Sequence, residues 1–217
     1  MTEKRHYVAC IDLDVRSVLV VGAGRVAHEK VRGLLDCGAA VTVVAPDVSP
    51  ELGALPVEVL RRSYRRSDLD GRYLVVAATD DPAVNTAVFA DAEARSLLCN
   101  VVDVPELCSF ILPALHRQDP ITVSVSTGGA SPVLAQRLRD EIARIVGPEH
   151  AALAIRLREL RPWAKQHLPT YEARRDYFAG IVRDELETAN GDQARVARPG
   201  ADEVDGHPSS SRMMPAK

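Results

Sequence analysis

A glycine loop placed between a strand and a helix constrains the fold of this chain more than any other feature of its sequence. Residues 17–21 form an apolar run rich in valine, which is typical of a strand buried on both faces. Residues 22–27 then read GAGRVA, and residues 26–37 carry apolar side chains at helical spacing up to Gly38. This order of strand, glycine turn and helix is typical of the first unit of a dinucleotide-binding fold.

The small residues of this loop each have a physical reason for their place. Gly22 permits the tight turn, Gly24 lets the backbone approach a pyrophosphate, and Ala27 lets the helix pack close to the sheet. The free N–H groups at the start of the helix then face the anion. A glycine turn without a ligand is the alternative. The predicted cofactor-binding residues are Gly22, Ala23, Gly24, Arg25, Val26, Pro46, Asp47 and Thr79.

An acidic residue after the second strand completes such a fingerprint, because its carboxylate binds the ribose hydroxyls. The predicted second strand ends at Ala45 with no carboxylate at its tip. We expect Asp47 to reach the adenosine ribose, unless it caps the segment that follows. No lysine or arginine immediately follows the strand to hold a 2′-phosphate, so the sequence favours NAD over NADP.

Apolar strand-like runs alternate with helical patterns over the first 110 residues or so, which predicts an α/β fold with a parallel sheet. Strands are expected at 17–21, 41–45, 57–60, 73–78 and 97–102, with helices at 26–37 and 83–95. The pattern then changes. Two strands at 109–115 and 121–126, joined by a loop at 116–120, precede helices at 133–146, 149–166 and 171–187. Residues 188–217 have few apolar side chains and no aromatic one, so we expect a disordered tail.

The composition excludes several classes of protein. Lysine and arginine total 27 against 30 acidic residues, a balance that does not favour nucleic-acid binding. No apolar run approaches the ~20 residues that span a bilayer, and the N-terminus has no apolar core of signal-peptide length. We therefore expect a cytoplasmic protein. The cysteines and histidines have no metal-ligand spacing, so we expect four reduced, mostly buried thiols and no metal held by the protein.

Acidic residues follow two of the later strands. Asp80 and Asp81 precede Pro82 and a predicted helix, which favours a capping role for the pair. Asp103 follows an apolar strand and precedes no helix of clear periodicity. Because ligands of such sheets bind outside the carboxyl ends of the strands, Asp103 is the candidate general base.

Four segments together resemble the precorrin-2 dehydrogenase module of siroheme synthases: GAGRVA, AATDDPAVN, NVVDVPELCSFILPA and VSVSTGGASPVLAQRLRDEI. The resemblance covers residues 7–182. It implies NAD-dependent oxidation of precorrin-2 to sirohydrochlorin in siroheme biosynthesis, followed in some members by ferrous iron insertion, a ferrochelatase (lyase) reaction. It also implies that Asp103 is catalytic. The fused uroporphyrinogen methyltransferase domain of some siroheme synthases is not expected, so the chain resembles the stand-alone form.

The resemblance and the patterns together predict four regions. These are an NAD-binding Rossmann domain at 1–112, a dimerisation region at 113–148, a helical region at 149–187 and the tail at 188–217. A homodimer is expected through residues 109–147, because two short strands leave open edges. The tetrapyrrole substrate carries many carboxylates. Its predicted binding residues are Ser126, Thr127, Gly128, Gly129 and Ser131, just before a helix N-terminus, although this segment also reads as a plain loop with a helix cap.

Arginine runs offer further partners for the substrate carboxylates, or are simply solvated faces. The first run contains Arg61, Arg62, Arg65 and Arg66, and the second contains Arg156, Arg158, Arg161 and Lys165. Two other functions stay open at this point. One is a regulatory nucleotide-binding domain of the type that gates potassium transporters, and the other is an NAD oxidoreductase for another small substrate.

Overall fold

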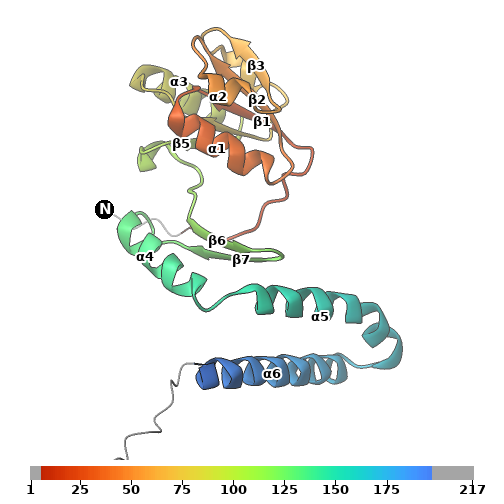
Figure 1. Ribbon diagram of the computed structural model, residues 1–217. Coiled ribbons are helices and arrows are strands. Elements are labelled where there is room, and N and C mark those ends of the chain that lie inside the picture. Colours follow the sequence, from red (N-terminus) through yellow and green to blue (C-terminus); the bar gives the residue numbers. More distant parts are fainter. Residues whose placement is uncertain (1–5, 197–217) are drawn as a thin grey trace, which may run out of the picture. The chain divides into compact units, whose positions relative to one another are not determined.

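The computed structural model describes residues 6–196, which divide into two compact units (Figure 1). The first unit includes residues 6–114 and residues 124–138. The second includes residues 115–123 and residues 139–196. Each unit is described by itself below.

A parallel sheet of five strands forms the centre of the first unit. The strand order is β3-β2-β1-β4-β5, with bounds Glu58–Arg61, Ala40–Ala45, Ser17–Val21, Leu74–Ala77 and Leu98–Val101. All five strands are confirmed where the sequence predicts them, with ends that differ by at most one residue. Val20 pairs with Val43 on one side and with Val76 on the other. Strand order reverses direction between β1 and β4, so a switch point lies at their carboxyl ends.

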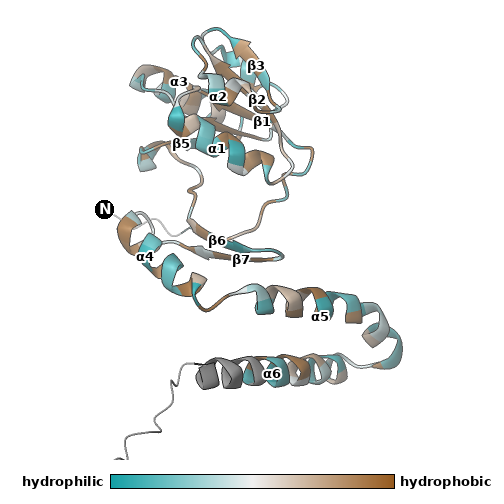
Figure 2. Ribbon diagram, in the orientation of Figure 1, coloured by the Kyte–Doolittle hydropathy of each residue, from teal (hydrophilic) through white to brown (hydrophobic). Residues whose placement is uncertain are grey.

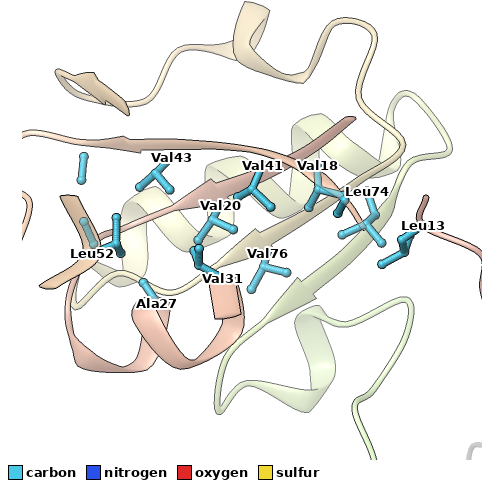
Figure 3. Close-up of a cluster of buried hydrophobic side chains, with 13 residues drawn as sticks. Leu13, Val18, Val20, Ala27, Val31, Val41, Val43, Leu52, Leu74 and Val76 are labelled. Carbon is cyan, nitrogen blue, oxygen red and sulfur yellow. The ribbon is translucent and has the colours of Figure 1, made fainter. Parts of the chain in front are cut away.

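Two apolar layers cover the two faces of this sheet. Alternate residues of β1 point to opposite faces, so Val20 belongs to one layer and Leu19 to the other. The first layer includes Ala27 and Val31 of α1 (Arg25–Leu35), and Figure 3 shows these side chains beside Val20 and Val76. Ala27 is fully buried, which confirms the close helix–sheet contact predicted for this position. The second layer is closed by α3 (Pro82–Glu93).

The short elements of the first unit were harder to predict. A four-residue helix, α2 (Pro50–Gly53), and the 3₁₀ turns η1 (Arg66–Leu69) and η2 (Pro105–Leu107) are too brief for an apolar period to reveal them. The start of α3 is different, because its cap is visible in the sequence. Asp81 accepts hydrogen bonds from the N–H groups of Ala83 and Val84, which confirms for Asp81 the capping role predicted for the Asp80–Asp81 pair.

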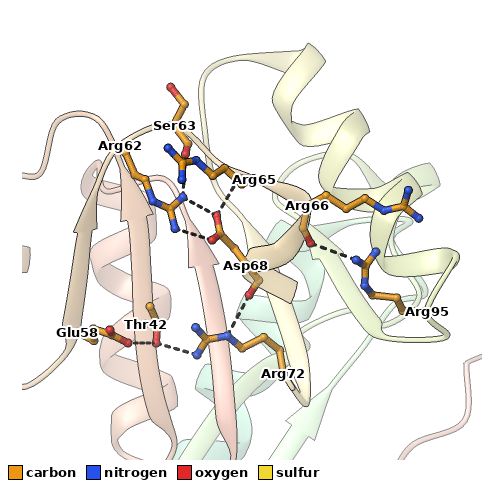
Figure 4. A network of polar contacts seen from close by, with 9 residues as sticks. All are labelled: Thr42, Glu58, Arg62, Ser63, Arg65, Arg66, Asp68, Arg72 and Arg95. Carbon is orange, nitrogen blue, oxygen red and sulfur yellow. Dashed lines mark hydrogen bonds and ion pairs between the residues drawn. The ribbon is translucent and has the colours of Figure 1, made fainter. Parts of the chain in front are cut away.

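An arginine network joins β3 to η1 (Figure 4). The Arg62 guanidinium donates to both carboxylate oxygens of Asp68, at 2.6 and 2.8 Å, and the Arg65 N–H donates to the same carboxylate at 2.8 Å. These hydrogen bonds, chiefly those from Arg62, hold the pKa of Asp68 below its usual range. Arg62 therefore has a partner within the fold, which counts against its predicted role as a substrate cation.

A hairpin follows the sheet. Its strands β6 (Ala114–Gln118) and β7 (Ile121–Val125) are joined by two residues, and so short a connection makes the pair antiparallel. Because β6 begins at Ala114 and ends at Gln118, the strand predicted at 109–115 is wrong over residues 109–113, and the loop predicted at 116–120 is wrong over residues 116–118. Pro113 lacks an N–H group and interrupts the run. The segment before it instead runs along the edge of β5, with an antiparallel bridge between Asn100 and Cys108.

The helix α4 (Pro132–Ala143) begins after the hairpin, as predicted. Its cap is Ser131, whose hydroxyl accepts from the Leu134 N–H at 3.2 Å. Figure 2 shows apolar residues alternating with hydrophilic ones along this helix. Several of these apolar side chains are exposed, and Val133 reaches 76%. Ile145, in the turn after α4, is exposed as well, at 67%.

Two long helices, α5 (Pro148–His167) and α6 (Tyr171–Val196), form most of the second unit. They contact each other through an ion pair between Arg156 and Glu185 and through the rings of Trp163 and Tyr177, whose centroids lie 5.4 Å apart. The sequence placed the end of α6 at Glu187, and this is wrong because the helix continues to Val196. Extending a formed helix costs little per residue. The remainder of the predicted tail, from residue 197, lies outside the described residues.

Candidate active site

A cleft of about 790 Å³ opens at the carboxyl ends of β1, β2 and β4. All eight residues predicted to bind the cofactor line it, including the glycine loop, Pro46, Asp47 and Thr79. The cleft thus lies at the switch point of the sheet, where open α/β sheets bind their ligands.

Gly22 occupies a position that excludes other residues. Its φ is +106°, a conformation that L-residues rarely adopt, and its N–H donates to the Val44 carbonyl at 2.9 Å. A Cβ atom placed here would lie 2.3 Å from the Ala78 carbonyl oxygen. The turn predicted at Gly22 is therefore fixed by contact with the end of β4.

Gly24 is constrained in a different way. Its backbone is extended, with φ −80°, and a Cβ atom would meet no atom of the protein within 4 Å. Gly24 is also the N-cap of α1, where no side chain caps the helix. The first N–H groups of α1 therefore have no side-chain cap, and the backbone that carries them lines the cleft. Such a cradle fits the pyrophosphate of a dinucleotide.

Asp47 lines the cleft just beyond β2, and its side chain is exposed. The N-cap of the following helix is Ser49, whose hydroxyl accepts from the Leu52 N–H at 3.3 Å. The alternative in which Asp47 caps that segment is therefore wrong. Its carboxylate stands at the cleft wall, where it has the chemistry to accept hydrogen bonds from ribose hydroxyls.

Thr79 is held in place by the start of α3. Its hydroxyl donates to Oδ1 of buried Asn85 at 2.8 Å, and Asn85 Nδ2 donates to the Thr79 carbonyl at 2.9 Å. The Asp81 N–H also donates to the Thr79 hydroxyl, at 3.2 Å. This network fixes the shape of the cleft wall after β4.

Ser63 and Tyr64 line the cleft from the end of β3, and sequence reasoning missed both. Tyr64 donates to Asp91 Oδ2 at 3.1 Å, and Arg66 pairs with the same carboxylate at 3.3 Å. Burial, together with the bond to Asp91, raises the pKa of Tyr64, so the phenol stays protonated. The one available signal was position, since these residues follow a strand that ends at the same edge as Gly22.

Asp103 lies two residues beyond the end of β5, at the same edge of the sheet. The Val102 N–H donates to the Ala77 carbonyl at 2.9 Å, which ties this turn to the end of β4. The side chain of Asp103 is exposed, and its φ is +61°. Asp103 is not among the residues that line the cleft. The structure therefore places it at the same edge of the sheet as the predicted cofactor residues, but not in the cleft with them.

The predicted substrate residues form a compact turn before α4. The Thr127 hydroxyl accepts from the Ser131 N–H at 3.0 Å, and the Ser126 hydroxyl accepts from the Gly128 N–H at 3.2 Å. Gly128 and Gly129 have positive φ angles of 63° and 88°. The five residues lie together, and none of them is among the residues that line the described cleft.

All four cysteines are present as thiols, and the expectation that most of them are buried is wrong. Only Cys99 is buried, and Cys10 is exposed. Within residues 6–196, no group of three or more potential ligands could hold a metal ion. No helix in the described part of the chain is long and apolar enough to cross a membrane.

Comparison with known families defines the class. A family model described as putative NAD(P)-binding matches residues 9–114, and one described as the sirohaem biosynthesis protein central segment matches residues 118–145. The chain thus combines a segment of the putative NAD(P)-binding class with one like the central part of sirohaem biosynthesis proteins. More specifically, it belongs to the siroheme synthase and precorrin-2 dehydrogenase family.

Individual relatives agree with this placement. The siroheme synthase of Methylobacillus flagellatus is 40% identical over 84% of this chain and 41% of its own length. That of Pseudomonas entomophila is 44% identical over 76% of this chain and 36% of its own length. The chain therefore spans about two fifths of these curated relatives. A solved structure titled SirC, precorrin-2 dehydrogenase, is 27% identical with a TM-score of 0.70, and the match covers 86% of this chain and 100% of that one.

Proposed function

We propose that this protein oxidises precorrin-2 to sirohydrochlorin with NAD in siroheme biosynthesis. The observation that carries the proposal is the match to the SirC structure along the whole length of that chain. Its title names precorrin-2 dehydrogenase. The longer siroheme synthases match over only part of their length, so the dehydrogenase is the activity that this chain shares with both.

The cleft supports NAD as the cofactor. The bare backbone at Gly24 and the open start of α1 suit a pyrophosphate, and Asp47 suits unphosphorylated ribose hydroxyls. Arg25 is the cation nearest in sequence to the cradle, and it pairs with Glu29 at 2.9 Å. When bound, NAD supplies the acceptor for the two electrons that leave the macrocycle as hydride.

We assign Asp103 as the acceptor of the proton that leaves the substrate. Loss of hydride from precorrin-2 must be accompanied by loss of a proton, and an exposed carboxylate at this sheet edge is placed to accept it. The polar turn at residues 126–131 would hold an acetate or propionate arm, because the Ser126 hydroxyl accepts from the Gly128 N–H and keeps its own proton to donate. Iron insertion stays a prediction.

We also propose that two copies of the chain pair through residues 109–147 and that the enzyme acts in the cytoplasm. The exposed apolar side chains of this region support the pairing, because an interface would remove them from contact with water. They are Val133, Leu134, Leu138 and Ile145. Light scattering should give twice the chain mass at micromolar concentration. A monomeric mass would contradict the proposal.

The activity is tested by mixing the purified protein with NAD and precorrin-2. NADH absorbance should rise in step with the spectrum of sirohydrochlorin. The Gly24→Val variant serves as the matched control, because it should fold and yet fail to bind NAD. NADH formation without sirohydrochlorin would favour another substrate, and NAD binding with no turnover would favour a regulatory domain.

A further inference from the structure

The turn that presents Asp103 is an unusual piece of backbone. The Val104 N–H donates to the Val101 carbonyl at 3.3 Å, which closes a four-residue turn with Asp103 at its third position. The φ of +61° at Asp103 is the conformation that glycine or asparagine favours there. The left-handed region is less favourable for a residue with a Cβ atom than for glycine, so neighbouring contacts help to hold this turn in shape.

The Cys108 thiol makes such contacts on both sides of Asp103. Its sulfur lies 3.2 Å from the Val101 carbonyl oxygen and 3.3 Å from that of Val104, and the S–H group donates to either one. These carbonyls belong to the first and last residues of the turn. A single side chain therefore joins the two ends of the backbone segment that carries the carboxylate.

Cys108 is itself anchored to the edge strand. The Ser109 N–H donates to the Cys99 carbonyl at 2.8 Å, and the Cys99 N–H donates to the Ser109 hydroxyl at 2.7 Å. Asn100 Nδ2 donates to the Phe110 carbonyl at 3.0 Å and reaches the Cys108 sulfur at 3.5 Å. These hydrogen bonds attach residues 108–110 to β5, and the Cys108 thiol therefore links the turn to that strand.

We propose that Cys108 is a positioning residue for Asp103. Through the Val101–Val104 turn, its thiol fixes the direction of the catalytic carboxylate. The inference rests on the proposed role of Asp103 as the proton acceptor. Cys99 provides the contrast. Burial raises the pKa of its thiol to about 12, and it belongs to the apolar layer beneath α3 rather than to the turn.

Three substitutions separate positioning from packing. Cys108→Val keeps the bulk and removes the donor, and we expect turnover of precorrin-2 to fall about 10- to 100-fold, as for a misplacement of about 1 Å. NAD affinity should be unchanged. Cys108→Ser keeps a donor and should recover most of the loss. Cys99→Ala should lower the melting temperature and leave turnover unchanged. Hydrogen exchange of the Val104 amide should accelerate in Cys108→Val only.

A double-mutant cycle with Asp103→Asn provides the decisive test. If Cys108 acts through Asp103, Cys108→Val should have little further effect once the carboxylate is gone. An equal loss in both backgrounds, or full activity in Cys108→Val, would overturn the positioning role alone. Native turnover in Asp103→Asn would instead overturn the proton-acceptor role of Asp103, and the inference with it.

Discussion

The parallel sheet and the region after it differ in how they bury apolar surface. In β1, β2, β4 and β5, nearly every residue is buried, in two layers that the helices cover, while the edge strand β3 is only partly buried. From β6 to residue 187, the buried apolar residues are Ala135, Ala151 and Ala164 in the described chain, while Val133, Ile145 and Trp163 are exposed. Such alanines contribute little core, since burial stabilises in proportion to apolar area. The sheet thus has an apolar core of its own, whereas the later region buries little apolar surface and leaves large apolar side chains exposed.

The largest effects are expected from substitutions of the two glycines of the loop, Gly22 and Gly24, which lie in the well-packed sheet unit. Gly22→Val should abolish folding of the sheet, because its Cβ would overlap the Ala78 carbonyl and its φ would be forbidden to valine. Gly24→Val should fold, since its side chain meets open space, and should lose NAD affinity. Circular dichroism and calorimetry measure the two outcomes. A folded Gly22→Val, or native NAD affinity in Gly24→Val, would contradict the assignment.

The next effect concerns chemistry rather than folding. Asp103→Asn preserves shape and tolerates the positive φ, so folding and NAD binding should survive. Dehydrogenation should fall by roughly 10²–10⁴-fold, the usual contribution of a positioned acid–base group. Initial rates with precorrin-2 measure this. A near-native rate would mean that Asp103 is not the proton acceptor.

The same contrast explains what the sequence could predict. The strands β1, β2, β4 and β5 are largely apolar runs, and such runs indicate burial on both faces directly. The glycine loop reports a ligand because Gly24 has no other structural reason to be small. Ser63 and Tyr64 gave no such signal, since only the folded sheet brings the end of β3 to the cleft.

Where prediction failed, the cause was local. The strand predicted from residue 109 begins only at Ala114, after Pro113, and α6 extends beyond the last apolar stripe. The relation between Cys108 and the Asp103 turn was also hidden, because it depends on a chain reversal that no periodicity records.

An intermediate effect on stability is expected at Asp68. Its side chain is only 5% exposed and pairs with Arg62, so Asp68→Asn should destabilise the sheet by about 1–3 kcal/mol. Because its folded pKa is lowered, the stabilisation is present above the unfolded pKa of about 3.9 and is lost as the pH falls through the folded value. Denaturation followed from pH 7 to pH 2 should show the variant and the native protein converging in acid. Parallel curves would mean that the pair is not the cause.

The smallest effect is expected where an ion pair lies in the later region. Arg156 and Glu185 join α5 to α6, but their side chains are 57% and 47% exposed. Water screens such a pair, so Glu185→Gln should cost less than about 1 kcal/mol. The loss should shrink further in 1 M salt, where the screening length is about 3 Å. The Asp68 effect should persist in the same salt, because that carboxylate is shielded from water. Urea unfolding of both variants at low and high salt measures the difference. If Glu185→Gln proves as costly as Asp68→Asn, the later region holds itself together better than its exposed surface indicates, and the contrast between the two regions would fail.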